Sequence, residues 1–125
     1  MSVSTHVLDT VLGRPAMGIA VRLFAEDELL AEAVTDTDGR ARLAEGATAA
    51  GTHRLVFTTG PWFTEQPTEI GPHRLIFTTG PWFAEQGRET FFPEVVLTFG
   101  VFEPGERHHV PLLLAPFAYS TYRGS

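Results

Sequence analysis

The sequence predicts an all-β sandwich, and three observations support this prediction. Turn signals recur at intervals of about 8–12 residues, as they do in sandwich folds. Between the turns, apolar and polar residues alternate with the period of a half-buried strand. No long stretch shows the 3.6-residue period of an amphipathic helix, so we expect a single short helix. A length of 125 residues fits a single domain, which we expect to span residues 1–125.

The first third of the chain carries four expected strands. Apolar residues alternate with other residues along Ile19–Phe24, which indicates one buried face. Gly13-Arg14-Pro15 indicates a turn before this strand. Asp38-Gly39 predicts a hairpin turn, because glycine tolerates the positive φ that such turns require. The expected strands are Thr5–Asp9, Ile19–Phe24, Leu29–Val34 and Arg40–Leu43.

The middle of the chain holds a tandem duplication. Residues 51–70 are followed at once by a near copy, residues 71–90, and each copy predicts a strand with a short helix after Gly-Pro-Trp-Phe. Two copies are too few for a repeat array, so we interpret the pair as a tandem duplication within one domain. Only one copy is expected to supply a regular strand of the sandwich, and we expect this to be the second copy. The displaced copy is expected as an added edge strand or packed on a neighbouring subunit.

The last third of the chain predicts three more strands. Glu94–Val101 reads as a long strand, and the turn signal Glu103–Glu106 follows it. Residues 108–125 then read as two strands joined by a tight apolar corner. The Trp-Phe pair of each copy could suggest a ligand platform, but we interpret Trp62-Phe63 and Trp82-Phe83 as core packing.

Composition excludes several classes of function. A net charge of −6 argues against nucleic acid as a partner. The chain has no Cys and no Lys, which excludes thiolate chemistry, disulfides and lysine Schiff bases and leaves Arg as the only strong cation. No apolar run approaches the roughly 20 residues of a membrane span, and no signal-peptide pattern is visible. We therefore expect a cytoplasmic protein with no membrane partner.

Each histidine needs its own interpretation, because a lone His is more often structural than catalytic. His53 and His73 occupy equivalent positions in the two copies, and we expect them on strand surfaces. His108 and His109 are neighbours in a strand, so their side chains point to opposite faces and cannot chelate a metal jointly. One of the two is expected to face a site, and the other solvent or a neighbouring subunit.

Familiar cofactor and nucleophile motifs do not occur in the sequence. Asp36-Thr37-Asp38-Gly39 faintly resembles the start of a calcium loop, but its glycine comes too early and Arg40 replaces the third acidic residue. No Gly-x-Ser-x-Gly elbow and no Gly-rich phosphate loop is present. Water attack is therefore favoured over a covalent intermediate.

Several short motifs occur in a fixed order along nearly the whole chain. Together they resemble the 5-hydroxyisourate hydrolases, the transthyretin-like enzymes of purine breakdown. A set of motifs in the right order is far more specific than any one of them. The duplication is the one departure: the resemblance implies a single such unit, so we expect one copy to be an extra strand and helix added to a complete domain. The motifs are Ser4–Thr10, Thr35–Arg40, Phe91–Val95, His109–Phe117 and Tyr122–Ser125.

This resemblance implies a fold, an activity and an assembly. The fold is a two-sheet prealbumin-like sandwich. The activity is the hydrolysis of 5-hydroxyisourate to 2-oxo-4-hydroxy-4-carboxy-5-ureidoimidazoline, without a cofactor. The assembly is a homotetramer, a dimer of dimers, with its sites at the dimer–dimer interface. The residues that the resemblance assigns to the site are His6, Arg40, His109, Tyr122 and Ser125.

The chemistry of these side chains fits that activity. Two imidazoles can activate a water and protonate a leaving nitrogen near neutral pH. Arg40 can hold a planar anionic heterocycle and stabilise an oxyanion, while Ser125 and Tyr122 can position water or substrate. Two other classes stay open: a transthyretin-like carrier that binds a small aromatic ligand without turnover, and a scaffold whose site the duplication has disrupted.

Overall fold

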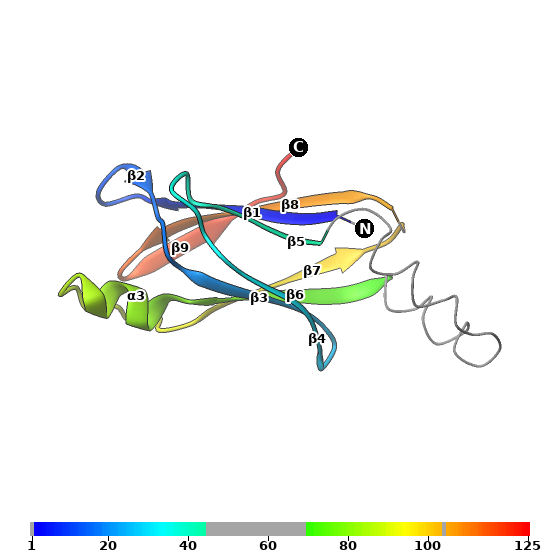
Figure 1. Ribbon diagram of the computed structural model, residues 1–125, viewed down its shortest axis with the longest axis horizontal. Helices are drawn as coiled ribbons and strands as arrows, with labels where there is room; N and C mark the ends of the chain where they lie inside the picture. Colours follow the sequence, from blue (N-terminus) through cyan, green and yellow to red (C-terminus); the bar gives the residue numbers. More distant parts are fainter. Residues whose placement is uncertain (1, 45–69, 104) are drawn as a thin grey trace.

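Two stacked β-sheets form the fold of this protein (Figure 1). The computed structural model describes residues 2–44, 70–103 and 105–125, so nearly all of the first copy, and with it the expected extra unit, lies outside the described residues. The expected all-β sandwich with one short helix is confirmed for the described part of the chain. Its elements are β1 (Ser2–Asp9), β2 (Arg14–Pro15), β3 (Ala20–Ala25), β4 (Glu28–Val34), β5 (Arg40–Ala44), β6 (Gly71–Thr78), α3 (Thr79–Glu85), β7 (Val95–Val101), β8 (Arg107–Ala115) and β9 (Ala118–Thr121).

The first sheet has the order β2-β1-β8-β9, and β5 also pairs with β1. β1 runs antiparallel to β2 and β5 and parallel to β8. Burial alternates along β1, so that Val3, Thr5 and Val7 point into the sandwich while Ser4 and His6 point outward. The turn expected at Gly13–Pro15 ends before Arg14, because Arg14 and Pro15 already form β2 and pair with Asp9 and Leu8 of β1.

The second sheet has the order β4-β3-β6-β7. β6 comes from the second copy, as expected, and it pairs with β3 on one side and β7 on the other. The helix α3 contains Gly-Pro-Trp-Phe and therefore begins earlier than the sequence predicts. Trp82 donates from its indole Nε1 to the Met17 carbonyl oxygen at 2.8 Å, and Phe83 is fully buried. The core-packing interpretation of this Trp-Phe pair is confirmed.

The core lies between the two sheets and draws side chains from both. Burying each large apolar side chain contributes roughly 1.5–3 kcal/mol, so this shared layer holds the sheets together. Among the described residues no helix has the length and apolar character that a membrane crossing requires. The largest fully buried apolar side chains include Ile19, Leu23, Leu75, Phe77, Phe83, Leu112 and Leu114.

The predicted hairpin at Asp38-Gly39 is wrong. The turn leads from β4 in the second sheet to β5 in the first sheet, so it connects the two layers. Gly39 has φ +77°, and a Cβ there would overlap the carbonyl oxygen of Val7. Glycine is therefore required both by the conformation and by the close approach to β1. Local turn chemistry identifies the glycine correctly but does not show which sheet the next strand joins.

The expected surface position of His73 is also wrong, while His53 lies outside the described residues. His73 is only 1% exposed and points between the sheets on the same side of β6 as Leu75. Its ring lies 5.9 Å from the ring of Phe99, which in turn lies 5.8 Å from the ring of the buried His108. The strand position places His73 in the interior, although its side chain is polar.

One buried ion pair connects the first sheet to the segment after α3. Asp9 is 1% exposed, and its carboxylate Oδ2 pairs with the guanidinium of Arg88. Asp9 Oδ1 accepts hydrogen bonds from the backbone N–H groups of Val11 and Leu12, both at 3.0 Å. Arg88 also lies over the Phe83 ring, 4.8 Å from its centroid. The ion pair therefore fixes the end of β1, the following turn and the helix segment together.

We predict that Arg88→Leu lowers the free energy of unfolding by about 3–5 kcal/mol, because it leaves the Asp9 carboxylate buried without its cation. Urea denaturation measures the change. Arg123→Leu is the matched control: it removes an exposed ion pair with Glu106 and should cost less than about 1 kcal/mol. Equal effects in the two variants would contradict a special role for the Arg88 pair.

We also predict that stability falls at mildly acidic pH because of His108. Burial lowers the pKa of His108 below its ordinary value of 6.5, and the nearby Glu106 offsets this only in part. The unfolded chain therefore binds a proton more readily, and the free energy of unfolding decreases as the pH drops below about 6.5. His108→Phe should flatten this decrease between pH 8 and pH 5.5 in denaturation experiments. An unchanged slope would assign the pH dependence to other groups.

Candidate active site

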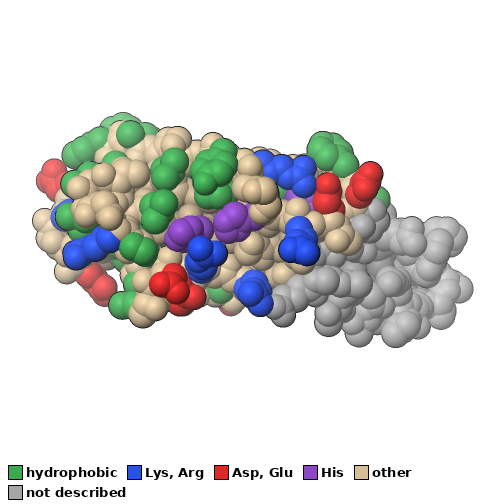
Figure 2. Space-filling model, turned by 90° about the horizontal axis from the view of Figure 1, so that it is seen from above, with side chains coloured by type: hydrophobic (Ala, Val, Ile, Leu, Met, Phe, Trp, Pro, Cys, Tyr) green, Lys and Arg blue, Asp and Glu red, His purple; other side chains and the backbone are tan. Residues whose placement is uncertain are grey.

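The outer face of the first sheet brings together the side chains from which a site could be built. Strand alternation turns Ser4 and His6 of β1 outward, and likewise Arg40 of β5 and His109 of β8. The strand register places His6 opposite Arg40 and Ser4 opposite His109. Figure 2 looks onto this face and shows histidine side chains beside arginine and acidic side chains near its centre.

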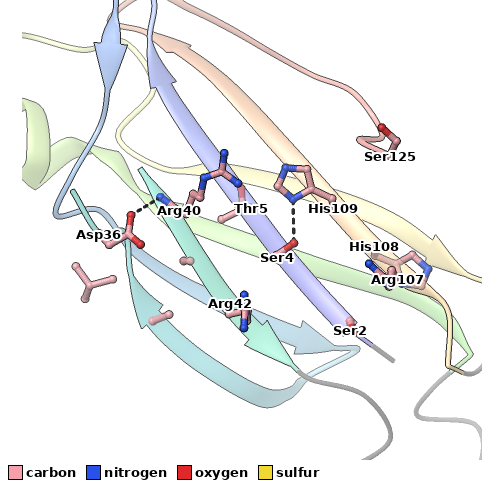
Figure 3. A pocket seen from close by; sticks show the side chains of 13 residues that line it. Ser2, Ser4, Thr5, Asp36, Arg40, Arg42, Arg107, His108, His109 and Ser125 are labelled. Atoms are coloured by element: carbon pink, nitrogen blue, oxygen red, sulfur yellow. Dashed lines mark hydrogen bonds between the residues drawn. The ribbon is translucent and has the colours of Figure 1, made fainter. Parts of the chain in front are cut away.

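A pocket of about 630 Å³ opens on this face. It is lined by residues from three strands of the first sheet, from the end of β4 and the segment after it, and from the last residue, Ser125 (Figure 3). Its lining mixes apolar surface with charged, imidazole and hydroxyl groups, and these polar groups can orient a ligand that is rich in oxygen and nitrogen. The lining residues are Ser2, Ser4, Thr5, Ala33, Val34, Asp36, Arg40, Ala41, Arg42, Arg107, His108, His109 and Ser125.

The structure brings together most of the residues that the sequence assigns to a site. Arg40, His109 and Ser125 line the pocket. His6 is not a lining residue, but it lies opposite Arg40 and close enough to His109 for its charge to act on that ring. Tyr122 is 59% exposed and does not line the pocket. Any part that Tyr122 plays in the site therefore stays a prediction.

Arg40 is held by the turn that precedes it. Asp36 Oδ1 accepts hydrogen bonds from the backbone N–H groups of Arg40 and Asp38, both at 2.9 Å. The bond from Arg40 is the main reason that the pKa of Asp36 lies below its usual value, and the positive charge of Arg40 adds to the effect. The carboxylate thus stays ionised and fixes the start of β5, from which the Arg40 side chain points to the pocket.

The His109 side chain is held in place by Ser4 of the neighbouring strand. Its ring is half-buried, and Nδ1 lies 2.9 Å from the Ser4 hydroxyl oxygen. Burial lowers the pKa of His109, and the charges of His6 and Arg40 lower it further. The imidazole is therefore mostly neutral at pH 7, the form that can accept a proton from water.

The neighbouring His108 points to the opposite face from His109, as expected. It does not face solvent or a subunit neighbour, however: it is 5% exposed and packs between the sheets beside Phe99. Its Nε2 lies 3.4 Å from the Glu106 carboxylate. The second half of that prediction is wrong, because the face opposite the His109 side chain is the inner face of the sandwich, and His108 itself is among the residues that line the pocket. In the part of the chain that the structure describes, no three metal-ligating side chains converge.

The sequence interpretation missed several residues of the pocket. Ser4 lies two residues before His6, and Arg42 lies two residues after Arg40. Residues at that spacing in a strand share a face, so this spacing was the signal that could have identified both. Asp36 was considered as part of a calcium loop and of the family motif Thr35–Arg40 but not as a site residue, and its hydrogen bonds to the turn carry no signature of their own in the sequence.

Comparison with known proteins places the chain in a family. The sequence model of the HIUase/Transthyretin family matches residues 3–70 and residues 65–124. The chain belongs to this family. The two matched ranges overlap at residues 65–70, and each contains one copy of the duplicated unit, so the HIUase/Transthyretin pattern holds one such unit.

Relatives of known name support the same placement within the HIUase/Transthyretin family. A 5-hydroxyisourate hydrolase of Halalkalibacterium halodurans is 38% identical over 98% of this chain and 97% of its own length. The structure of Klebsiella pneumoniae 5-hydroxyisourate hydrolase matches with a TM-score of 0.74 at 35% identity, and the match covers 100% of both chains. Sea bream transthyretin in complex with thyroxine matches with a TM-score of 0.70 at 25% identity, over 98% of this chain and 93% of the transthyretin chain.

Proposed function

We propose that this protein hydrolyses 5-hydroxyisourate to 2-oxo-4-hydroxy-4-carboxy-5-ureidoimidazoline in urate degradation. The observation that carries the proposal is the convergence of Arg40, His109 and Ser125 on one pocket from three separate parts of the chain, with His6 opposite Arg40. Full-length similarity to proteins named 5-hydroxyisourate hydrolase supports the same substrate.

The proposed chemistry is the addition of water to a ring amide. One imidazole takes a proton from water, and the resulting hydroxide adds to the amide carbonyl carbon to give an oxyanion. The guanidinium of Arg40 holds the planar substrate and stabilises that oxyanion. The C–N bond then breaks, the leaving nitrogen receives a proton from the second imidazole, and a carboxylate remains. Ser125 and Tyr122 are proposed to position water and substrate.

His6 and His109 are the two groups proposed to exchange protons. The depressed pKa of His109 keeps that ring neutral near pH 7, as a base requires. The reaction needs no change in oxidation state, and water is the only co-reactant. The proposal includes no metal and no organic cofactor, because the two imidazoles transfer the protons and the guanidinium stabilises the oxyanion.

The test is to add the protein to freshly generated 5-hydroxyisourate and to follow its ultraviolet absorbance. We expect decay well above the spontaneous rate, with His6→Ala and His109→Ala each slower by about 10²–10⁴-fold because a proton-exchanging group is lost. Arg40→Lys should not restore activity, because an ammonium cannot make the two-pronged contact of a guanidinium. Circular dichroism of each variant checks that the fold is kept.

Three other outcomes of the assay would each lead to a different conclusion. Saturable binding without faster decay would favour the carrier alternative, for which thyroxine-bound transthyretin provides a structural parallel. Neither binding nor decay would indicate a scaffold with a disrupted site. Wild-type rates in both His variants would contradict the assignment of the two imidazoles.

We propose further that residues 1–125 form one domain that assembles as a homotetramer, a dimer of dimers. Core side chains shared by both sheets support the single domain. Exposed Phe117, Tyr119 and Tyr122 on and after the β8–β9 hairpin offer an apolar surface for a second copy.

The expected cytoplasmic location stays a prediction, which fractionation of expressing cells would check.

Sedimentation velocity tests the assembly. We expect a species of about four chains, and Tyr119→Glu should shift it to smaller species, because a buried unpaired carboxylate opposes association. Val11→Glu, also at an exposed apolar residue but in the turn between β1 and β2, is the matched control and should leave the assembly unchanged. A wild-type monomer would contradict the proposed tetramer.

A further inference from the structure

The His109 side chain is held from two directions. On one side, the hydroxyl oxygen of Ser4 lies 2.9 Å from Nδ1 of the ring (Figure 3). On the other side, Gly124 lies against the ring: a Cβ added to Gly124 would stand 2.5 Å from His109 Cδ2. The Gly124 backbone N–H donates to the His109 carbonyl oxygen at 2.8 Å, which keeps the two residues together.

The sheet itself sets the distance between Ser4 and His109. The two residues are direct partners in the parallel pairing of β1 with β8, and both side chains point outward. Paired strands are rigid, so this contact does not depend on a loop. Both residues are half-buried, which limits competition from water for the hydrogen bond.

With Nδ1 engaged by Ser4, Nε2 is the ring nitrogen left for a ligand in the pocket. In a neutral imidazole one ring nitrogen carries a hydrogen and the other carries a lone pair that accepts hydrogen bonds. The hydrogen bond made by one nitrogen therefore decides whether the other nitrogen is a donor or an acceptor. The positive guanidinium of Arg40 acts on His109 from within the same pocket. A cation favours a lone pair at the nitrogen that faces the pocket and disfavours an N–H there.

We propose that Ser4 and Gly124 are positioning residues for His109. Ser4 Oγ accepts a hydrogen bond from the Nδ1–H of His109, so that the lone pair of Nε2 faces the pocket and His109 serves as the base. Gly124 has no side chain because its backbone lies against the ring and keeps it in this orientation. The assignment of the base rests on the proposed function, whereas the arrangement of the ring does not.

The arrangement of the ring is tested without substrate. Nitrogen-15 NMR of histidine-labelled protein at pH 8 distinguishes a protonated from an unprotonated ring nitrogen, and comparison with His109→Gln assigns the signals. We expect a protonated Nδ1 and an unprotonated Nε2 in His109. Ser4→Thr should keep this pattern, while Ser4→Ala should give averaged signals from both tautomers. A protonated Nε2 in the wild-type protein would overturn the proposal.

Kinetics on 5-hydroxyisourate tests the positioning role. Ser4→Ala should lower kcat by about 10–100-fold with little change in KM, the range typical when the partner that orients a working imidazole is lost. Ser4→Thr should restore most of the rate. Ser120→Ala is the matched control, because this exposed serine of β9 lies on the same sheet outside the pocket. A rate for Ser4→Ala equal to that of the control would overturn the role of Ser4.

Gly124→Ala tests the second contact. The added methyl group must displace the His109 ring, so kcat should fall while circular dichroism and thermal unfolding stay close to those of the wild type. Unchanged kcat in this variant would overturn the role of Gly124. If the wild-type protein does not act on 5-hydroxyisourate, the proposed function fails, yet the nitrogen spectra still decide the arrangement of the ring.

Discussion

The structure depends first on the parallel pairing of β1 with β8. This pairing runs from Ser2 opposite Arg107 to Asp9 opposite Leu114 and forms the centre of the first sheet. It determines which side chains reach the pocket, because successive residues in a strand point to opposite faces. A slip of one residue in β8 would turn His109 into the core and bring the buried His108 to the surface. The apolar residues that alternate with these positions prevent such a slip.

Sequence patterns predicted the strands well where the apolar pattern and burial agree, as alternation does in β3 and the apolar run does in β8. They were wrong at Asp38-Gly39, since a turn signal describes a local bend and does not identify the sheet that receives the next strand. They were wrong at His73, because residue polarity was weighed above strand position. Site residues came from the family resemblance. The spacing of Ser4 from His6 could have placed Ser4 on the same strand face, but its partner His109 is 105 residues away in the sequence, and local patterns do not show that contact.

The choice between the two copies of the duplicated unit has a physical explanation in the residues where they differ. Arg88 of the second copy supplies the cation for the buried Asp9, and Thr90 donates from its hydroxyl to the Pro116 carbonyl oxygen at 2.7 Å. The first copy has Thr68 and Ile70 at the corresponding positions, and neither can make these contacts. The strand residues of the two copies are nearly identical, so the contacts after the helix distinguish them.

The pairing of β1 with β8 also has a consequence for folding kinetics. Ser4 and His109 are 105 residues apart in the sequence, so their contact closes one of the longest loops that this chain can form. Loop closure costs more entropy as the loop lengthens, and distant pairings therefore tend to form late. The second sheet is built from pairings that are closer in sequence and does not need this step. We expect the pairings of the second sheet to form before the pocket exists, so that ligand binding would report only the last stage of folding.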